Sequence, residues 1–370
     1  MSLDKLTEMS NRYGCNEDYV LAGGGNTSFK DENTLYVKAS GAGLSDIKPE
    51  QFVLMNLELL LQIIGNGYPK NMSQSEKEEK SLSDMLAARK PGEENKRPSI
   101  ECILHAMFPY KYVLHVHPPL INGLTCSING KKDCLNLFGD SVIWIDLTKP
   151  GFALAQACSK AFNYYKDEKC IYPQIAILQN HGIFISADTV DEIDEQMDFV
   201  VSKLSARIYE KPQFDEVEYD KKIVADITDK LKTIYPETVE YVVVFCTNRQ
   251  VVKFVANKES FKPVSKPFTP DHIVNCKDEP IFIDSVDNIE KEFSSYTEIK
   301  GYKPKIIAVK DLGFFALSEN QKNAERAKAL FLDAIKIATY AKSFEGVNPL
   351  NEEFTSFILN WEAESYRSKL

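Results

Sequence analysis

Residues 175–189 read IAILQNHGIFISADT, and this stretch decides the fold class. Residues 175–178 and 183–185 are short apolar runs, typical of buried β-strands, and the Asn180-His181-Gly182 turn separates them. A long helix is expected over residues 189–209. A strand–turn–strand–helix unit of this kind predicts a domain in which strands and helices alternate, that is, an α/β fold.

Outward from this unit the same alternation continues in both directions. Strands are expected at residues 36–40, 111–117, 142–146, 241–246, 251–255, 281–284 and 305–309, and helices at residues 1–14, 50–64, 99–107, 151–166 and 324–344. Residues 65–96 are polar, and we expect a surface excursion around one short helix there. The segment 211–220, which contains Pro212, is the expected boundary between a domain of residues 1–213 and a C-terminal α/β domain of residues 214–370.

The C-terminal part contains a stretch that is similar in sequence to residues 175–189. Residues 306–320 read IIAVKDLGFFALSEN, and a helix is expected after them, as after residues 175–189. The glycines of the two stretches, Gly182 and Gly313, are 313 − 182 = 131 residues apart. Two interpretations stay open: two ordinary strand–turn–strand–helix units, or a degenerate second copy in which Leu312 stands where His181 stood. In either case the chemistry is expected in the first half.

The composition is that of a globular protein that does not bind nucleic acid. Of the 370 residues, 44% are hydrophobic and 26% are charged, and the formal net charge is -10. Such an acidic chain repels nucleic acid over most of its surface. A small anionic ligand can still bind where backbone N–H groups and a metal supply a local positive field.

Two absences indicate a cytoplasmic protein. The first residues lack the pattern of a secretory leader, and no run approaches the roughly 18 apolar residues of a membrane span. The eight cysteines are scattered, with no Cys-x-x-Cys pair, as expected of reduced and mostly buried thiols. We therefore expect a small-molecule substrate and no membrane or nucleic-acid partner.

Three of the five histidines form a candidate metal site. His115 and His117 end an apolar strand, and residues i and i+2 of a strand point to the same face. Both imidazoles can therefore reach one ion, while Val116 faces the opposite side. His181 supplies a third donor from a turn in which Gly182 permits a sharp bend. Three neutral nitrogen donors with one open coordination position are typical of a catalytic zinc site.

The order of the surrounding motifs resembles the class II aldolase/adducin family of sugar-phosphate aldolases and epimerases. The resemblance covers residues 18–210 and rests on four segments: Gly24-Gly25-Asn26-Thr27-Ser28, Ala39-Ser40-Gly41, Pro98-Ser99-Ile100-Glu101 with His115-Val116-His117-Pro118, and Asn180-His181-Gly182. Within the family the chain is most similar to bacterial rhamnulose-1-phosphate aldolase units that are fused to a dehydrogenase. The long insertion before Arg97 and the motif Thr269-Pro270-Asp271-His272 are shared with that group, but no Gly-x-Gly-x-x-Gly segment of a dehydrogenase follows.

The resemblance implies a three-layer α/β/α fold with a central, mostly antiparallel sheet. It also implies that His115, His117 and His181 bind Zn²⁺ and that Glu101 is the catalytic acid/base. Cleavage of a ketose 1-phosphate between C3 and C4 leaves an enediolate of dihydroxyacetone phosphate. A metal stabilises such an anion as a Lewis acid, and a neighbouring carboxylate can move protons on and off the carbon or the hydroxyl.

A phosphate site is expected on the glycine-rich turn and two nearby loops, where N–H groups and hydroxyls converge. Its predicted residues are Gly25, Asn26, Thr27, Ser40, Gly41 and Ser99. Ile100 departs from the family, whose members often carry a second serine there. His272 is a candidate substrate contact. His105 is expected to be packed and hydrogen-bonded. Lys38 and Arg97 are candidates to assist the phosphate, but the plain expectation is that both are exposed.

The preferred function is an aldolase that converts rhamnulose 1-phosphate or fuculose 1-phosphate to dihydroxyacetone phosphate and lactaldehyde. A pentulose-phosphate 4-epimerase, which uses the same metal and retro-aldol step, is one alternative. By resemblance, epimerases carry His-x-His-Ser and lack a glutamate matching Glu101, which favours a lyase. A non-catalytic adducin-like scaffold is the other alternative, but such proteins typically lose the three histidines. The resemblance further implies a homo-oligomer, with a tetramer expected.

Overall fold

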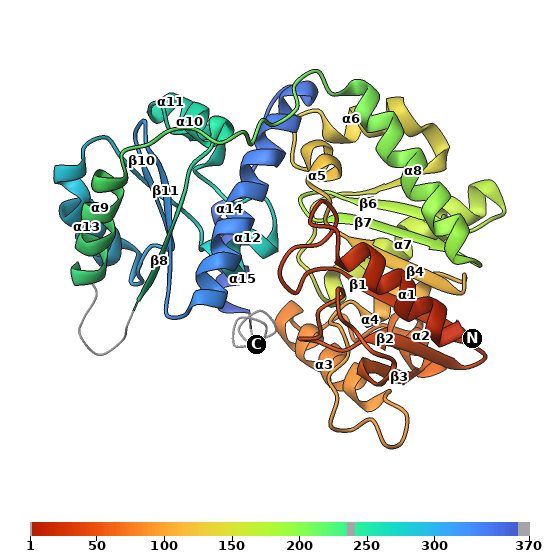
Figure 1. The fold of residues 1–370 in the computed structure, drawn as a ribbon. Coiled ribbons are helices and arrows are strands. Elements are labelled where there is room, and N and C mark those ends of the chain that lie inside the picture. Colours follow the sequence, from red (N-terminus) through yellow and green to blue (C-terminus); the bar gives the residue numbers. More distant parts are fainter. Residues whose placement is uncertain (1, 235–240, 362–370) are drawn as a thin grey trace. The chain divides into compact units, whose positions relative to one another are not determined.

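The computed structural model describes residues 2–234 and 241–361, which form two compact units (Figure 1). Within these residues the first unit comprises 2–125 and 129–207, and the second comprises 126–128, 208–234 and 241–361. The chain therefore leaves the first unit after Arg207, close to the boundary expected at residue 213. Residues 126–128 differ from the expectation of contiguous domains, because the Ile128 N–H donates to the Gly346 carbonyl and Ser127 bridges to Val347.

The first unit is built on a seven-stranded sheet with the order β3-β2-β1-β4-β7-β6-β5. Its strands are β1 (Asn26–Asp31), β2 (Thr34–Lys38), β3 (Phe52–Asn56), β4 (Tyr112–Val116), β5 (Ile143–Ile145), β6 (Ile175–Leu178) and β7 (Gly182–Ala187). Its helices are α1 (Ser2–Gly14), α2 (Leu57–Asn66), α3 (Gln74–Ala87), α4 (Cys102–Met107), α5 (Pro119–Thr125), α6 (Gly130–Phe138), α7 (Phe152–Lys169) and α8 (Val190–Arg207). Within this sheet only β5 and β6 run parallel, and every other neighbouring pair is antiparallel.

Helices cover both faces of this sheet. Helices α1, α5 and α8 pack on one face, and α2, α4 and α7 pack on the other, with α3 against α2 and α7 (Figure 1). The predicted three-layer α/β/α architecture with a mostly antiparallel sheet is therefore confirmed.

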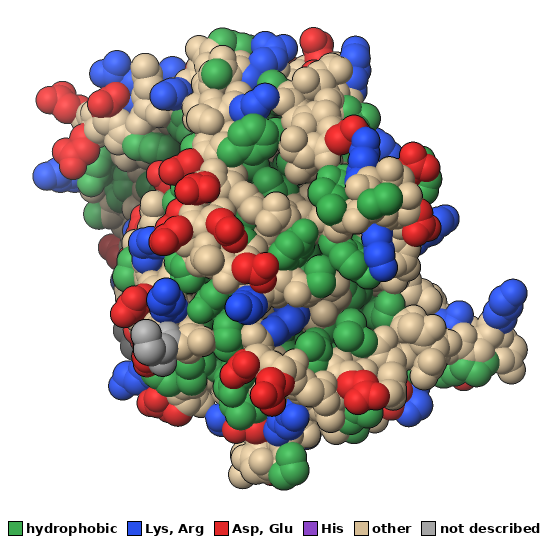
Figure 2. Space-filling view, turned by 90° about the vertical axis from the view of Figure 1, so that its right-hand side faces the viewer, with side chains coloured by type: hydrophobic (Ala, Val, Ile, Leu, Met, Phe, Trp, Pro, Cys, Tyr) green, Lys and Arg blue, Asp and Glu red, His purple; other side chains and the backbone are tan. Residues whose placement is uncertain are grey.

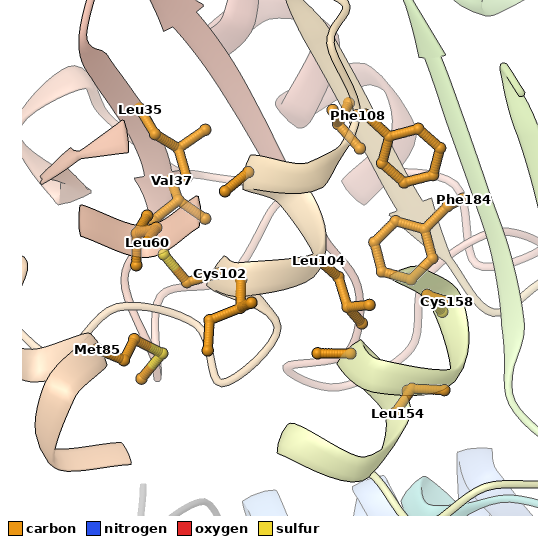
Figure 3. Packing of buried hydrophobic residues seen from close by; sticks show 14 of the residues in the cluster. Leu35, Val37, Leu60, Met85, Cys102, Leu104, Phe108, Leu154, Cys158 and Phe184 are labelled. Carbon is orange, nitrogen blue, oxygen red and sulfur yellow. The ribbon is translucent and has the colours of Figure 1, made fainter. Parts of the chain in front are cut away.

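A continuous apolar core fixes α4 on the sheet. Leu35 of β2, Leu60 of α2, Leu104 of α4 and Phe184 of β7 belong to one buried cluster (Figure 3). Removing a side chain of this size from water stabilises the fold by about 1.5–3 kcal/mol. Because α4 is held in this way, Glu101 at its N-terminal end has a fixed position relative to the strands.

The second unit has a smaller sheet with the order β8-β11-β10-β9. Its strands are β8 (Val242–Cys246), β9 (Ile281–Ile283), β10 (Ile306–Val309) and β11 (Gly313–Ser318). Its helices are α9 (Lys221–Ile234), α10 (Arg249–Phe254), α11 (Lys258–Phe261), α12 (Pro270–Cys276), α13 (Ile289–Lys300), α14 (Gln321–Ala341) and α15 (Glu352–Asn360). Apolar residues of α9 and α13 share a core cluster with the strands, and α14 packs against β8, β10 and β11.

The second sheet matches one half of the first in strand order and direction. The order β8-β11-β10-β9 corresponds to β4-β7-β6-β5, with the last pair parallel and the other pairs antiparallel in both sheets. Helices α8 and α14 follow the matching strands β7 and β11. The matching turns also agree, because Asn180 (φ 53°) and Asp311 (φ 57°) both adopt the left-handed conformation.

Two of the expected elements are wrong, and a cap explains each. Residues 50–64 were expected to form one helix, but β3 occupies 52–56 and α2 begins only at Leu57. Pairing of β3 with β2 overrides the helical pattern, and the Asn56 side chain caps α2 by accepting from the Leu59 N–H. The strand expected at 251–255 is the helix α10, because Asn248 caps it through the Val251 N–H.

The surface and the thiols fit the composition. The face shown in Figure 2 carries basic and acidic side chains interspersed among apolar ones. The eight cysteines are all free, and most are buried, as predicted. Among the described residues no helix has the length and apolar character needed to cross a membrane. The helix expected at 1–14 is α1, and Met1 lies outside the described residues.

Candidate active site

The sheet brings the three predicted metal ligands together. His115 lies in β4 and His117 follows it, while His181 lies in the turn between β6 and β7. Strand β4 pairs with β7, so that His115 stands opposite Phe184 and the turn lies beside the end of β4. One ligand atom from each histidine lies within 4.8 Å of the other two, and Nε2 of His115 is 2.9 Å from Nε2 of His117. These rings form the histidine cluster.

The environment of His115 prepares it to bind a cation. Its Nδ1–H donates to the Ile183 carbonyl at 2.9 Å, which leaves the lone pair on Nε2, the atom that faces the cluster. Burial lowers the pKa of His115 to about 4, against the opposing effect of Glu101. The ring is therefore neutral at pH 7, as a metal ligand must be.

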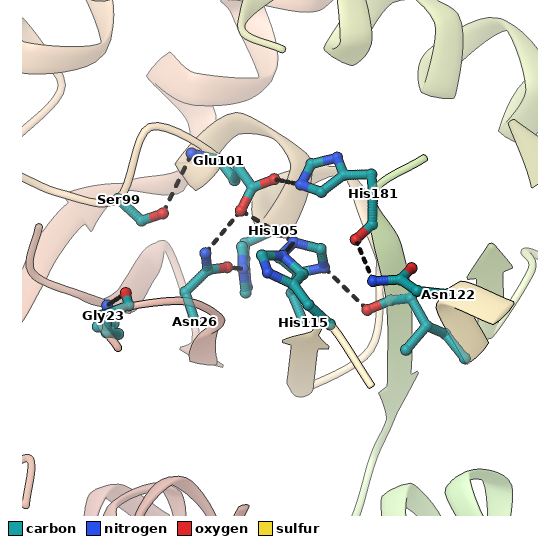
Figure 4. A network of polar contacts seen from close by, with 11 residues as sticks. Gly23, Asn26, Ser99, Glu101, His105, His115, Asn122 and His181 are labelled. Carbon is teal, nitrogen blue, oxygen red and sulfur yellow. Dashed lines mark hydrogen bonds and ion pairs between the residues drawn. The ribbon is translucent and has the colours of Figure 1, made fainter. Parts of the chain in front are cut away.

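Glu101 faces the histidine cluster from the N-terminal end of α4 (Figure 4). Its Oε1 is 3.2 Å from Nε2 of His181, and its Oε2 is 3.3 Å from Nε2 of His115. Burial acts to raise the pKa of Glu101, but the two histidines outweigh it and hold the pKa well below its usual range. The sequence alone would favour a solvated glutamate at this position, whereas only 7% of the residue is exposed.

One oxygen of this carboxylate has no hydrogen bond. Despite its distance to His181, Glu101 Oε1 is buried without a hydrogen-bonding partner among the described residues. A buried acceptor of this kind usually has a partner. Three imidazoles and a carboxylate form the donor set of a divalent cation site, so the residues present fit a metal such as zinc. His115, His117 and His181 would hold it.

The turn before β1 approaches the histidine cluster closely. Gly25 has a φ of 66°, and a Cβ placed there would lie 2.9 Å from the His115 carbonyl oxygen. A side chain larger than that of glycine is therefore excluded by both conformation and space. Asn26 stands opposite His115 in the β1–β4 pairing, and its Nδ2 donates to Glu101 Oε2 at 2.7 Å. The structure thus places Asn26 beside the carboxylate.

Thr27 points away from this group. Successive side chains of a strand face opposite sides of the sheet, and Thr27 is fully buried with its hydroxyl 2.7 Å from that of Ser10. The Thr27 hydroxyl therefore faces Ser10 on the opposite side of the sheet from Glu101, and the phosphate role of Thr27 stays a prediction. The physical reason is that β1 already begins at Asn26, so alternation decides the direction of Thr27.

The other predicted phosphate residues lie on two adjoining segments. The Ser40 N–H donates to the Arg97 carbonyl at 2.8 Å, and the Ser99 N–H donates to the Lys38 carbonyl at 3.0 Å. Gly41 follows with a φ of 90°. The Ser99 hydroxyl accepts from the N–H of Glu101 at 3.3 Å, which links this loop to the carboxylate. The structure thus brings Ser40, Gly41 and Ser99 into one loop pair.

Lys38 was expected to be exposed, and it is buried. Only 4% of the residue is exposed, and its Nζ donates to the Gly23 carbonyl at 3.4 Å. It therefore connects the end of β2 to the glycine-rich turn that carries Gly25. The sequence signal was ambiguous because a lysine that ends a strand is more often solvated.

Hydrogen bonds from α5, which the sequence did not reveal, hold the turn that carries His181. Asn122 of α5 donates from Nδ2 to the His181 carbonyl at 3.2 Å, and its Oδ1 accepts from the Thr125 hydroxyl at 2.8 Å. The N–H of Asn180 donates to the Thr125 carbonyl at 3.2 Å. No motif marks Asn122, because its partner is a backbone group 59 residues away.

His272 lies in the second unit and is buried there. Its Nδ1 is 2.9 Å from the Thr269 hydroxyl, and it accepts from the Thr269 N–H at 3.2 Å in the first turn of α12. Its Nε2 is 3.2 Å from Oδ2 of Asp333 on α14. The structure therefore shows His272 joining two helices of its own unit, and its contact with a substrate stays a prediction.

The second unit has no histidines at the positions that match the histidine cluster. The pairs His115–Phe184 and Phe245–Phe315 correspond in the two registers. Phe245 therefore stands where His115 stands, Thr247 where His117 stands, and Leu312 where His181 stands. The Thr247 hydroxyl donates to the Leu312 carbonyl at 2.6 Å. None of these three side chains offers an imidazole to a cation.

Comparison with known proteins agrees with this architecture. The chain belongs to the class II aldolase and adducin family, because the model of the Class II Aldolase and Adducin N-terminal domain matches residues 4–202. The matched region is more than half of the chain and contains Glu101 and the histidine cluster.

The individual proteins that match this chain have low sequence identity to it. An uncharacterised oxidoreductase of Bacillus subtilis (strain 168), YuxG, is 22% identical over 415 residues, and this chain spans 58% of its length. Among solved structures, the N-terminal class II aldolase domain of a conserved Thermoplasma acidophilum protein is 26% identical, with a TM-score of 0.47, over 56% of this chain and 93% of that one. An L-fuculose 1-phosphate aldolase is 17% identical, with a TM-score of 0.37, over 62% of this chain and 96% of that one.

Proposed function

We propose that the protein is a zinc-dependent aldolase that cleaves a ketose 1-phosphate, such as rhamnulose 1-phosphate or fuculose 1-phosphate, to dihydroxyacetone phosphate and an aldehyde. The observation that carries the proposal is the carboxylate of Glu101 beside His115 and His181, with one buried oxygen that accepts no hydrogen bond. A buried acceptor that makes no hydrogen bond destabilises the fold, so its presence suggests that a ligand completes the site. Membership of the family supports the same conclusion.

In the proposed reaction the C3–C4 bond of the sugar breaks and its electron pair stays on C3. The C4 hydroxyl loses its proton and becomes the carbonyl of the aldehyde, and C3 gains a proton. A bound divalent cation supplies Lewis-acid stabilisation of the developing negative charge. Glu101 is ionised in the resting site, so it can accept the hydroxyl proton and return a proton to carbon. No net proton is consumed.

The phosphate is assigned to the turn before β1 and the loop pair of Ser40, Gly41 and Ser99. Gly25 and Gly41 both have a positive φ, and backbone N–H groups in such turns can converge on an anion. The buried ammonium group of Lys38 lies next to this turn, because its Nζ donates to the Gly23 carbonyl. A positive charge in this position can strengthen the binding of a phosphate. We include Lys38 in the proposed phosphate site.

A product assay tests the proposal. Purified protein is incubated with rhamnulose 1-phosphate and with fuculose 1-phosphate, with and without a chelator, and dihydroxyacetone phosphate is detected enzymatically. We expect product from at least one sugar, loss of product after chelation, and recovery when zinc is restored. Absence of product from both sugars by a zinc-loaded protein would contradict the proposal. A pentulose 5-phosphate, followed for inversion at C4, tests the epimerase alternative in the same experiment.

The proposal extends to the assembly and to the second unit. We infer that the second unit is a degenerate copy of the β4–α8 half of the first and binds no metal. In keeping with the family resemblance, we propose a cytoplasmic homo-oligomer, with four subunits expected. Light scattering after size-exclusion chromatography measures the number of subunits, and a monomer at micromolar concentration would contradict this part.

A further inference from the structure

A buried row of polar side chains leads from the Glu101 carboxylate through Asn26 to His105, beside His115 (Figure 4). Ser28 Oγ lies 2.7 Å from Nδ1 of His105, and His105 Nε2 contacts Oδ1 of Asn26. Asn26 Nδ2 donates in turn to Glu101 Oε2 at 2.7 Å. His105 has no exposed surface, and Asn26 is only 6% exposed. Four side chains from two elements therefore form one hydrogen-bonded series that ends on the carboxylate.

Strand and helix geometry place these residues in line. Asn26 and Ser28 are two residues apart on β1, so their side chains lie on the same face of the sheet. His105 lies four residues after Glu101, hence on the same side of α4. The ring of His105 also packs against Phe184, with a centroid distance of 5.5 Å. The His105 ring thus lies between the two β1 side chains and the core.

In each hydrogen bond of this series only one of the two side chains can be the donor. A carboxylate accepts, so the Asn26 amide must present Nδ2 to Glu101 and Oδ1 to His105. Asn26 Oδ1 can only accept, so Nε2 of His105 must carry the ring proton. Burial, and then the charge of Lys30, hold the pKa of His105 well below its usual range, so the neutral ring accepts at Nδ1 from the Ser28 hydroxyl.

We propose that His105 is a positioning residue for Glu101 and acts through Asn26. The Nε2–H group of His105 holds Oδ1 of Asn26, while the Glu101 carboxylate holds the Nδ2 end of the same amide. Without His105, Oδ1 would be buried with no donor, and the amide would no longer be held in place against Glu101. Bonds of this kind, aligned in one direction, polarise one another in a buried environment. The inference rests on the proposed function in one respect, which is that Glu101 is the acid/base.

Turnover measurements separate positioning from mere packing. His105→Leu removes both hydrogen bonds at similar volume, and His105→Gln keeps a donor and an acceptor. Ser186→Ala is the control, because Ser186 is also buried in the first sheet and its hydroxyl donates to the Gln174 carbonyl, outside the series that ends on Glu101. We expect H105L to lose at least about tenfold in kcat, with KM and zinc content within about twofold. H105Q should recover most of the loss, and S186A should match the wild type.

A second pair of measurements does not need activity. With five histidines in the chain, ¹⁵N NMR of the metal-free protein can assign the His105 tautomer. We expect the proton on Nε2. A crystal structure of H105L should show the Asn26 amide and the Glu101 carboxylate displaced or in two conformations. A proton on Nδ1, an unmoved carboxylate, or an unchanged kcat in H105L would overturn the inference. If the wild type cleaves no sugar phosphate while the tautomer and the displacement are as expected, the proposed function fails and the positioning role stands.

Discussion

Glu101 illustrates how much of a residue's role its neighbours decide. A glutamate at the start of a helix is usually solvated, and its sequence position alone does not distinguish it from Glu50 or Glu76. Family resemblance singled it out, and the structure adds that it is buried against His115 and His181. His105 is packed and hydrogen-bonded, as predicted, whereas Lys38 was predicted to be exposed and is buried. Their partners come from β1 and the glycine-rich turn, which no local pattern connects to them.

Replacement of Lys38 tests the phosphate site. Lys38→Met removes a buried positive charge next to the glycine-rich turn and keeps most of the side-chain volume. If the charge binds the substrate phosphate, KM for the ketose 1-phosphate should rise by about 10- to 100-fold, because hydrogen bonds to charged groups contribute about 1.5–3 kcal/mol. The value of kcat should change little. Lys160→Met, at an exposed position, is the control, and equal KM values in both variants would contradict the assignment.

Lys30 predicts a pH dependence of stability. It is buried, donates to the Tyr110 carbonyl at 3.1 Å, and burial lowers its pKa to about 7 from 10.5. The unfolded chain therefore holds this proton at pH values where the folded chain has released it. The contribution of Lys30 to stability is complete above pH 10.5 and is lost as the pH falls toward 7. The slope approaches about 1.4 kcal/mol per pH unit inside that window.

Urea unfolding of the wild type and Lys30→Met at pH 7.5 and 9.5 measures this effect. Lys30→Met should be the more stable protein at pH 7.5, and its advantage should shrink by about 1–3 kcal/mol at pH 9.5. A difference that does not change with pH would mean that Lys30 stays charged in the folded protein.

Secondary structure elements were predictable where local pattern and tertiary pairing agree. The strand–turn–strand–helix stretch at 175–209 appears as β6, β7 and α8 within a few residues of the prediction. The prediction of a helix over residues 52–56 was wrong because pairing with β2 overrides the helical pattern of the apolar residues. The prediction of a strand over residues 251–254 was wrong because the β-branched residues there were given more weight than the helix cap formed by Asn248. Caps and long-range pairing therefore decide the cases that periodicity leaves open.

The two matching turns give a paired prediction. A Cβ on Gly182 would lie 2.5 Å from the Val116 carbonyl oxygen and 2.7 Å from Cδ2 of His117. A Cβ on Gly313 would lie 2.5 Å from the Cys246 carbonyl oxygen. Both Gly182→Ala and Gly313→Ala should destabilise their units, by about 1–3 kcal/mol each. Only Gly182→Ala should also lower zinc affinity, because it displaces His117.

Calorimetric unfolding and zinc titration measure these two effects separately. Gly65→Ala in α2 is the control, since a Cβ there meets nothing within 4 Å and alanine favours the helix. Loss of zinc affinity in Gly313→Ala would contradict the assignment of the metal to the first unit alone.

At the scale of the whole molecule, two features were predictable and one was not. Alternating strands and helices fixed the α/β class, and the spacing of the two glycines drew attention to the matching halves. The sharing of residues 126–128 with the second unit could not be predicted, because it depends on hydrogen bonds to residues 346–348. Contacts over such sequence distances leave no periodic signal.

The metal content of the chain tests the proposal that the first unit binds a metal ion and the second unit binds none. We expect one zinc ion per chain by elemental analysis, and none bound tightly in His181→Ala. Leu312→His should not add a second ion, because Phe245 and Thr247 stand at the other two matching positions. Two zinc ions per wild-type chain would contradict the proposal that the second unit binds no metal.

The central claim is that Glu101 performs acid/base chemistry beside a metal held by the histidine cluster. Glu101→Gln keeps the size of the side chain and an acceptor for Asn26, but removes the ionisable group. Its turnover of the preferred ketose 1-phosphate should be measured together with its zinc content, beside the exposed control Glu50→Gln. The account predicts one zinc per chain and a kcat lower by about 10²–10⁴-fold in Glu101→Gln alone. Turnover within a few-fold of the wild type, with zinc bound, would contradict it.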